Sequence, residues 1–390
     1  MFCGQSNRFC RKHKGTFQLK TGFKKVCFFM PRAFQVLKGE KSGGAELNTF
    51  YIADIFNKLP GFEIDFLTGI NGKSECKKIN SVNFTGIKYL ELKKSNIFYK
   101  VAARFYFLKE IFNKKSDIYF FSGASEFFGL GVIFLKILRP KSKIIYRGAS
   151  DFDFNYRFLI KKPIIYFFTY IGLKFCDYII VQNRLQKTLL KKFKNKKIKT
   201  VRCGVFDITK NTDMTDKHYF LYVGKYTEIK KPKIFLKIVK KFPDKKFVAI
   251  ITGDGKIKED FLSQSEKLKN LTVIDYVPWN DIGSYFQKAK ALINTSIYEG
   301  FPNTFIQSFI SKTPVLSLYV NPDNILDDYK TGYFAEGKFE NLVLFIKNTD
   351  NNTYMEMGEN SFNYVLKNHT VDKLISSYRK IFNKVSKLNV

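Results

Sequence analysis

Residues 25–69 read KVCFFMPRAFQVLKGEKSGGAELNTFYIADIFNKLPGFEIDFLTG, and the order of their apolar and glycine-bearing segments decides the fold. The apolar run KVCFFM predicts a buried strand that Pro31 ends. A loop with glycines follows, and apolar residues at helical spacing predict a helix that starts near Ala45. EIDFLTG then predicts the next strand. Strand, glycine loop, helix and strand in this order are typical of a βαβ unit in a parallel sheet.

The same alternation continues along the rest of the chain. Further strands are predicted at DIYFFSG, KIIYRGAS and DYIIVQN, with helices between them. After a polar stretch without periodicity, a second series of strands is predicted at YFLYVGKY, FVAIITGDG, LTVIDYV, ALINTSI and PVLSL. We therefore predict an α/β protein with two Rossmann-like doubly wound domains facing each other across a cleft.

The composition shifts predict where these domains begin and end. Residues 1–24 are polar, basic and without period, which predicts a disordered tail. The first domain is predicted at residues 25–206, a linker at 207–217, the second domain at 218–370 and a terminal helix at 371–390.

The chain is strongly basic, with 67 Lys and Arg against 34 Asp and Glu and a formal net charge of +33. An excess of this size attracts phosphates, nucleic acid or an anionic membrane surface. Lys, Phe, Ile and Asn are also abundant together, as expected of an AT-rich genome, so the charge has either a functional or a compositional origin. No helix-turn-helix, RNP-like motif or zinc finger is found, which predicts no nucleic-acid partner.

Six cysteines are scattered without a CxxC pair, and no cleavable apolar leader precedes them. This pattern predicts a reducing, cytoplasmic location. Cys3, Cys10 and His13 lack a fourth partner at suitable spacing, so no metal site is predicted. The apolar run PIIYFFTYIGLKFC is too short to span a bilayer, and membrane contact would be peripheral, through basic and aromatic surface.

Two loops carry residues that suit a phosphorylated sugar donor. In VGKYTEIKK, Lys225 and Lys230 lie on one loop after a strand, and two ammonium groups there suit a diphosphate, although solvated surface lysines are the alternative. In YEGFPNTFIQ, Pro302 predicts the first turn of a helix that runs to about Lys312. The free N–H groups of that turn predict an anion site, with Glu299 just before it.

In this order, the motifs GGAE (residues 43–46), VGKY with Lys230, GDG (253–255), EGFPN and PVLSL resemble the retaining GT-B glycosyltransferases of family 4. The resemblance covers about residues 25–370. It implies a nucleotide-diphospho-sugar held mainly by the second domain, an acceptor held by the first, and a C-terminal helix that crosses back to the first domain. It implies no cofactor and no obligatory metal.

The resemblance also implies roles for individual residues. The donor diphosphate would be held by Lys225 and Lys230 with help from the loop of Gly43 and Gly44. The sugar would be held by Glu299 and by the backbone of Gly300, Phe301, Pro302 and Asn303. Position 307 would meet the ribose, and Val277 would offer a backbone contact to the base.

Two positions depart from the family pattern. Gln307 stands where the family has a second Glu, and an amide oxygen still accepts a hydrogen bond. The histidine often found near residue 147 is absent, and Arg147, Asp151 and Asp153 stand there instead. We expect Arg147 to act as an electrostatic helper and Asp151 to bind substrate.

We expect no histidine base, because His13, His218 and His369 are predicted to lie away from the cleft loops. Retaining transfer on the front face of the donor can use the departing phosphate oxygen instead. The sequence DFD also resembles the DxD metal clamp of the other large glycosyltransferase fold, but it lies in a first-domain loop.

The predicted function is transfer of a sugar, of the hexosyltransferase type, from a UDP- or GDP-sugar onto a glycan or lipid-linked acceptor of a bacterial surface polysaccharide. The predicted location is cytoplasmic, with peripheral contact at the anionic inner face of the membrane. The alternative is a GT-B-like nucleotide-sugar epimerase, which would react without an added acceptor. Phosphorylases need bound pyridoxal and a much longer chain.

Overall fold

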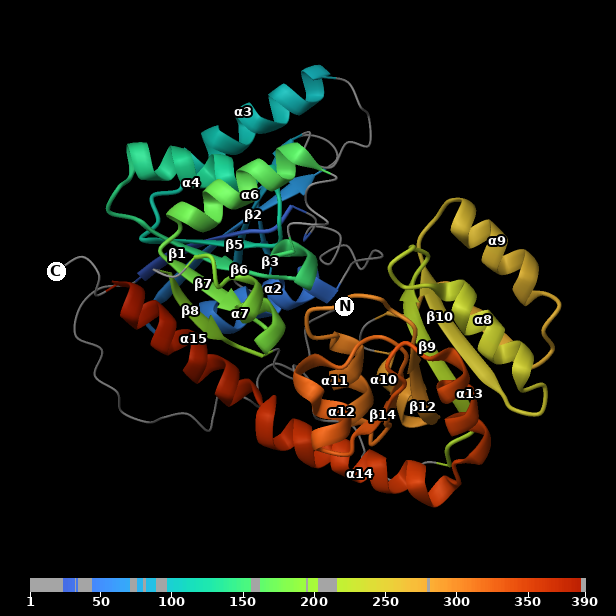
Figure 1. The fold of residues 1–390 in the computed structure, drawn as a ribbon. Helices are drawn as coiled ribbons and strands as arrows, with labels where there is room; N and C mark the ends of the chain where they lie inside the picture. The colour runs from blue at the N-terminus through green and yellow to red at the C-terminus, as the bar shows by residue number, and fades with distance from the viewer. Residues whose placement is uncertain are drawn as a thin grey trace.

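The computed structural model describes residues 24–31, 33, 44–70, 76–79, 82–88, 97–155, 162–193, 196–202, 216–278 and 281–386. These residues form two mainly parallel sheets, each covered by helices on both faces (Figure 1). The predicted class, α/β with two Rossmann-like doubly wound domains, is confirmed. Of the predicted tail only Lys24 is described, as the first residue of β1, and of the predicted linker only residues 216 and 217 are described.

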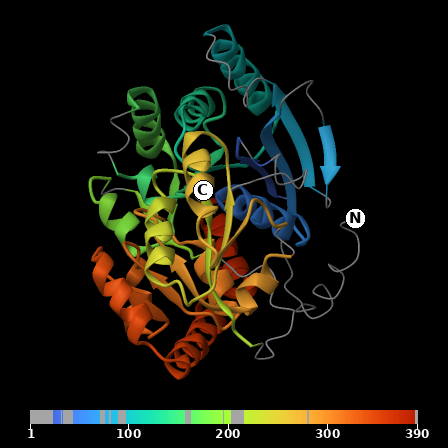
Figure 2. The ribbon, with the colours of Figure 1, turned by 90° about the vertical axis from the view of Figure 1, so that its right-hand side faces the viewer.

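The first sheet has eight strands in the order β3-β4-β2-β1-β5-β6-β7-β8. All of them are parallel except β3, which pairs antiparallel with β4. Strands β3 and β4 form the outer edge of this sheet (light blue in Figure 2) and were not predicted from the sequence. The strands are β1 (Lys24–Phe29), β2 (Phe62–Ile70), β3 (Cys76–Ile79), β4 (Val82–Lys88), β5 (Ile118–Ser122), β6 (Lys143–Arg147), β7 (Tyr178–Val181) and β8 (Lys197–Thr200).

Helices bury both faces of this sheet, as the unbroken apolar run of β1 predicts. Val26 and Phe28 point into the core beneath one set of helices, and Cys27 and Phe29 point into the core beneath the other. Helices α2 (Gly44–Asn57) and α15 (Val371–Ser386) contribute to the first core. Helices α3 (Ile97–Asn113), α4 (Glu126–Leu138) and α6 (Pro163–Phe175) contribute to the second. The short elements η2 (Asp151–Asp153) and α7 (Arg184–Leu189) follow β6 and β7.

The second sheet has six parallel strands in the order β11-β10-β9-β12-β13-β14. Its strands are β9 (Tyr219–Lys225), β10 (Phe247–Thr252), β11 (Leu271–Ile274), β12 (Ala289–Asn294), β13 (Val315–Ser317) and β14 (Gly332–Phe334). The helical elements of this domain are α8 (Pro232–Lys241), α9 (Lys256–Ser265), α10 (Gly283–Gln287), α11 (Asn303–Ile310), η3 (Pro322–Asn324), α12 (Ile325–Asp328), α13 (Phe339–Asn348) and α14 (Asn351–Asn368). Among the described helices, none is both long and apolar enough to cross a membrane.

The C-terminal helices cross from the second domain to the first. Helix α14 packs in the second domain, and α15 continues beneath the first sheet (Figure 1). Phe382 of α15 is fully buried, and its ring centroid lies 4.9 Å from that of Phe56 on α2. The first hydrophobic core is therefore completed by residues that are more than 300 positions away in the sequence.

Strand order also fixes where a ligand can bind. In each sheet the order in which strands are added reverses at the first strand, so the switch point lies between β1 and β5 in one domain and between β9 and β12 in the other. Ligands of open α/β sheets bind outside the carboxyl ends of the strands at such points. A ligand of the second sheet is therefore expected to bind at the loops after β9 and β12.

Replacing Phe382 by Ala tests the contribution of α15 to the first domain. We expect Phe382→Ala to lower the free energy of unfolding by about 3–5 kcal/mol, because it empties a fully buried site. The measurement is urea denaturation followed by circular dichroism. The matched control is Phe98→Ala, whose side chain is 78% exposed and which should change stability by less than about 0.5 kcal/mol. Equal effects of the two variants would contradict the packing described.

Candidate active site

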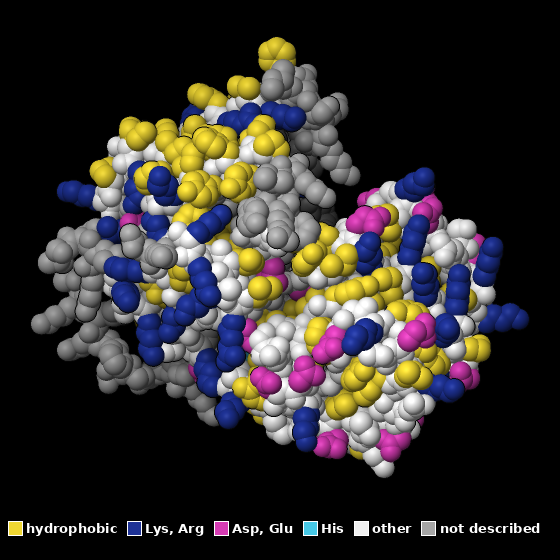
Figure 3. All heavy atoms as spheres, viewed as in Figure 1, with side chains coloured by type: hydrophobic (Ala, Val, Ile, Leu, Met, Phe, Trp, Pro, Cys, Tyr) yellow, Lys and Arg dark blue, Asp and Glu magenta, His cyan; other side chains and the backbone are white. Residues whose placement is uncertain are grey.

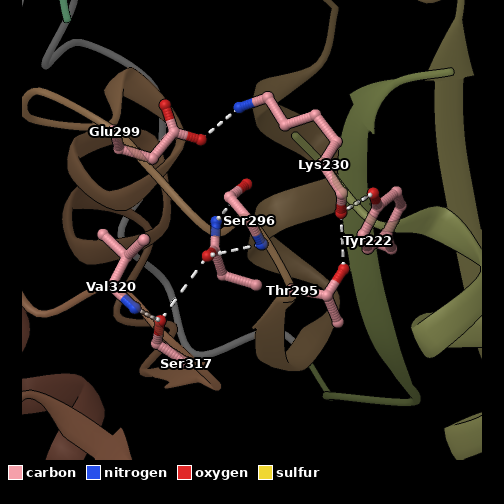
Figure 4. Close-up of polar contacts among 8 residues, drawn as sticks. Tyr222, Lys230, Thr295, Ser296, Glu299, Ser317 and Val320 are labelled. Atoms are coloured by element: carbon pink, nitrogen blue, oxygen red, sulfur yellow. Dashed lines mark hydrogen bonds and ion pairs between the residues drawn. The ribbon is translucent and has the colours of Figure 1, made fainter. Parts of the chain in front are cut away.

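Two residues predicted from separate motifs meet at the switch point of the second sheet. Lys230 lies in the loop after β9, and Glu299 lies in the loop after β12. The Lys230 Nζ pairs with the Glu299 Oε1 (Figure 4). Their side chains keep 25% and 16% of their surface exposed, so both groups remain accessible to solvent. An ammonium and a carboxylate are thus fixed side by side.

The loop that carries Lys230 is also fixed by hydrogen bonds that its backbone accepts. Tyr222 donates its hydroxyl to the Lys230 carbonyl at 3.0 Å, and Thr295 Oγ1 donates to the same oxygen at 2.7 Å. Burial raises the pKa of Tyr222, which keeps this donor protonated. Lys231 adopts a left-handed backbone with φ of 48°, which turns the chain into the first residue of α8, Pro232. Backbone strain of this kind is typical of functional loops.

A second network supports the loop after β12. Asn294 Oδ1 accepts hydrogen bonds from the Ser296 N–H at 3.2 Å and from Ser317 Oγ at 3.5 Å (Figure 4). Ser317 Oγ in turn accepts from the Val320 N–H at 3.2 Å. These groups are buried and hydrogen bonded to one another, so the segment that leads to Glu299 has little freedom.

The helix after Glu299 begins one residue later and ends earlier than predicted. Pro302 takes the N-cap position in extended conformation (φ −64°, ψ 125°), and α11 runs from Asn303 to Ile310. No side chain caps the first turn, so the N–H groups of its first two residues are available to an anion at the positive end of the helix dipole, while the Phe305 N–H donates to the Pro302 carbonyl at 3.0 Å. Gln307 lies half-buried one turn inside, as predicted, and its carbonyl accepts from Ser311 Oγ at 2.9 Å.

The start of α11 lies against the start of α2 in the first domain. Asn303 Nδ2 donates to the Gly44 carbonyl at 2.9 Å, and Asn48 Nδ2 donates to Asn303 Oδ1 at 3.3 Å. A Cβ at residue 44 would lie 2.8 Å from Asn303 Nδ2, so a larger residue there would displace the Asn303 amide from this contact. The amino ends of two helices therefore meet across the domains. Gly43, predicted to assist, lies outside the described residues.

Asn183 makes a second bridge between the domains, which the sequence analysis missed. It is the N-cap of α7, and its Nδ2 donates to the Gly300 carbonyl at 2.6 Å and to Asp151 Oδ1 at 3.0 Å. A Cβ at residue 300 would lie 3.0 Å from the Ala149 carbonyl oxygen. The signal for Asn183 was a polar pair, QN, directly after the apolar strand YIIV.

Asp151 and Asp153 have different environments, although they are two positions apart. Burial raises the pKa of Asp151 to about 6; the hydrogen bond from Asn183 lowers it, and the charge of Glu299 raises it further. Asp153 accepts three backbone N–H bonds, from Ala149 at 2.6 Å, Ser150 at 3.2 Å and Ala124 at 3.2 Å. Asp153 therefore organises its own loop, which is a structural role unlike that of a metal clamp.

Three other predicted residues lie at or just after the carboxyl ends of strands. Lys225 is half-buried at the end of β9, and Val277 is buried in the core after β11. Arg147 is buried at the end of β6, where it donates to Ser122 Oγ at 3.5 Å. The roles assigned to these three residues stay predictions.

One histidine lies closer to the site than predicted. The ring of His369 packs against the ring of Phe301 with a centroid distance of 4.8 Å, so the prediction that His369 lies away from the cleft loops is wrong. His369 is buried, and its Nε2 lies 3.3 Å from the Tyr364 hydroxyl. His369 therefore packs against Phe301 in the loop that carries Glu299.

Comparison with known proteins identifies the domain that carries the site. The model of the family glycosyl transferases group 1 matches residues 206–363, which include Lys225, Lys230, Glu299 and Gln307. An uncharacterized glycosyltransferase of Methanocaldococcus jannaschii is 28% identical over 165 residues, which are 37% of this chain and 40% of that protein. An alpha-monoglucosyldiacylglycerol synthase of Acholeplasma laidlawii is 29% identical over 111 residues, which are 28% of each chain. The aligned parts thus span less than half the length of either relative.

The whole fold has counterparts among solved structures. Sucrose-phosphate synthase from Thermosynechococcus elongatus superposes with a TM-score of 0.72 at 13% identity, over 93% of this chain and 98% of that chain. At this identity the likeness concerns the fold alone. Together with the family match over residues 206–363, it confirms the predicted resemblance to group 1 glycosyltransferases with the GT-B fold.

Asp151→Asn should reveal the cost of burying this carboxylate. The pKa is raised from 3.8 to about 6, so the native state binds the proton more tightly than the unfolded chain. Stability is therefore lost as pH rises through this window, and the loss above it amounts to about 3 kcal/mol. Asn stays neutral and still accepts from Asn183.

We expect the melting temperature of Asp151→Asn to differ little from wild type near about pH 4 and to exceed it most near neutral pH. Thermal unfolding across a pH series measures this difference. Asp244→Asn, at an exposed aspartate, is the control for the substitution itself. A difference that does not change with pH would contradict the assignment.

Proposed function

We propose that this chain, whose second half carries a glycosyl transferases group 1 domain on a GT-B fold, is a retaining family 4 enzyme. It transfers a sugar from a UDP- or GDP-sugar to a glycan or lipid-linked acceptor in bacterial surface polysaccharide synthesis. The observation that carries the proposal is the Lys230–Glu299 pair at the switch point of the second sheet. It offers a phosphate ligand and a sugar-hydroxyl ligand next to each other.

The donor diphosphate fits the positive groups around this pair. Lys230 and Lys225 supply ammonium groups from one loop, and the uncapped first turn of α11 supplies N–H groups. The amino end of α2 faces the same point through the Gly44–Asn303 contact. Negative charge grows on the diphosphate as it leaves, so these groups stabilise the transition state more than the ground state.

Glu299 and the backbone of residues 300–303 would hold the sugar. Its carboxylate is anchored by Lys230 and accepts hydrogen bonds from hydroxyls or balances the positive charge that develops at the anomeric carbon. The C–O bond to the diphosphate breaks while the acceptor oxygen bonds on the same face. The departing phosphate oxygen takes the acceptor proton, so the step needs no separate histidine base.

The acceptor would lie on the first-domain side, near Asp151 and Arg147. The Acholeplasma relative, whose name denotes a glucosylated diacylglycerol, supports a lipid or lipid-linked acceptor for this chain. The net charge of +33 supports a cytoplasmic protein that contacts an anionic membrane face peripherally.

Ligand-observed NMR with a panel of nucleotide sugars tests the proposed donor class before any acceptor is known. We expect saturation transfer to one UDP- or GDP-sugar and competition by the matching nucleoside diphosphate. Donor conversion to an isomeric sugar without an acceptor would instead establish the epimerase. If no nucleotide sugar bound, the proposal would fail.

Lys230→Ala should lower kcat far more than it weakens donor binding. The expected loss is about 2–4 kcal/mol of barrier, as for other single groups that stabilise developing charge. The matched control is Lys233→Ala, which removes another paired lysine, 2.8 Å from Asp260 and close in sequence. Steady-state kinetics of both variants are decisive, since an unchanged kcat for Lys230→Ala removes it from the site.

Variants at the two ends of YEGFPNTFIQ should separate sugar contact from ribose contact. Glu299→Gln keeps the shape but deletes the charge, and should lower kcat by more than about tenfold. Gln307→Glu still offers an acceptor oxygen and should preserve activity within a few-fold. Gln307→Leu removes that oxygen and should raise the donor KM by the equivalent of about 1–3 kcal/mol. A harmless Glu299→Gln, or a Gln307→Leu with an unaltered donor KM, contradicts these roles.

A further inference from the structure

Exposed hydrophobic side chains are concentrated on one part of the surface. Of the eighteen large hydrophobic side chains exposed among the described residues, eleven belong to α3, α4 and α6. We call them the apolar face: Phe98, Val101, Phe105, Phe112, Ile133, Ile137, Leu138, Ile164, Phe167, Tyr170 and Phe175. Hydrophobic atoms cover the upper left of the molecule in Figure 3, where Figure 1 places these helices. A patch of this extent marks an interaction surface.

Helix α3 is apolar on two opposite sides. Phe107 and Ile111 are fully buried against the sheet. Phe98, Phe105 and Phe112, each seven residues from the next, form a stripe on the outer side, and Phe105 is 64% exposed. A surface helix normally has one apolar side, which faces the core, and a polar opposite side. The core explains only one of these two sides.

Helices α4 and α6 extend the same surface because they pack very closely. A Cβ at Gly129 would lie 2.1 Å from the Phe168 carbonyl oxygen, and one at Gly172 would lie 2.4 Å from the Phe128 ring. The absence of side chains at these two glycines brings the helices together. Ile137 on α4 and Phe167 on α6 therefore belong to one continuous apolar face.

Lysines surround the apolar face. Lys100 and Lys109 on α3, Lys162 before α6 and Lys174 on α6 are exposed. Acids are fewer there, and Glu126 is already paired with Arg104 at 2.8 Å. Long lysine side chains can lie along lipid while their ammonium groups reach phosphate.

We propose that the apolar face with these four lysines docks onto an anionic lipid bilayer. The inference rests on the proposed function and specifies which surface of the first domain faces the membrane that supplies a lipid-linked acceptor. The charge of the lysines favours a bilayer over a second copy of the chain, because a second copy would bring the same lysines against each other. An anionic bilayer offers both apolar depth and negative headgroups.

The position of the apolar face suits delivery of a lipid-linked acceptor. Helices α3 and α6 lead back from the carboxyl edge of the first sheet to β5 and β7, and Phe98 and Ile164 of the apolar face lie in their first turns. A bilayer on the outer side of these turns therefore borders the carboxyl edge of the first sheet, on the side assigned to the acceptor. A headgroup could reach the site without its acyl chains leaving the membrane.

Vesicle flotation with the full chain tests this docking surface. Wild type should bind vesicles with a quarter anionic lipid at least about tenfold more than neutral vesicles, and binding should fall between about 20 and 150 mM salt as charges are screened. The triple variant Phe98→Ser, Phe105→Ser and Phe167→Ser should lose about tenfold or more. Its matched control replaces three exposed residues of the second domain, Leu344→Ser, Met355→Ser and Leu366→Ser, and should stay within twofold.

Two sets of lysine variants test the contribution of charge to vesicle binding. Lys100→Gln, Lys109→Gln and Lys174→Gln together should weaken binding to anionic vesicles several-fold and reduce its salt dependence. The same change at Lys237, Lys240 and Lys241 on α8 removes equal charge from the second domain and should have a much smaller effect. Equal effects of the two sets would overturn the assigned surface.

Two further measurements separate the outcomes. A dimer in sedimentation velocity that the triple serine variant dissociates would overturn the bilayer in favour of a second copy. Donor binding by NMR should be unchanged in the triple variant, because the apolar face lies outside the donor site. If wild type bound no nucleotide sugar while the vesicle pattern held, the proposed function would fail and the docking surface would stand.

Discussion

Two backbone carbonyls accept hydrogen bonds from the opposite domain, and the position of the loop after β12 depends on these contacts. The Gly300 carbonyl accepts a hydrogen bond from Asn183 Nδ2 at 2.6 Å, and the Gly44 carbonyl accepts one from Asn303 Nδ2 at 2.9 Å. A Cβ at either glycine would lie within 3.0 Å of an atom of the opposite domain. A side chain at residue 44 would displace the Asn303 amide, and one at residue 300 would crowd the Ala149 carbonyl. Either change would weaken the hydrogen bonds that hold the start of α11 against the first domain.

This contact also brings charged groups of the two domains close enough to interact electrostatically. Lys230 and Glu299 are fixed to each other within the second domain, because the loop after β9 is hydrogen bonded to the loop after β12. Asp151 belongs to the first domain, and the charge of Glu299 helps to raise its pKa. A ligand that neutralised Glu299 would therefore ease ionisation of Asp151. The charge states of these two carboxylates are therefore coupled across the domain boundary.

The sequence predicted those features that depend on local pattern. Alternating apolar runs predicted most strands, and the order of the loops placed Lys230 and Glu299 at one sheet edge before any contact was visible. The edge strands β3 and β4 were missed because their sequence, with Lys and Asn among few apolar residues, has the composition of a loop. Asn183 and His369 were missed for another reason. Their partners, Gly300 and Phe301, lie 117 and 68 positions away, and no periodicity reports such contacts.

The structure also bears on whether the unusual composition is functional. A base-composition bias raises Lys and Phe everywhere, and it would scatter exposed aromatic residues over both domains alike. Lysines are indeed spread over both domains, as a bias predicts (Figure 3). Exposed apolar residues are instead concentrated on α3, α4 and α6. Since exposing Phe to water is costly wherever it occurs, a bias alone gives no reason to collect Phe98, Phe105 and Phe167 on one surface. Contact with lipid gives such a reason, because it removes these residues from water.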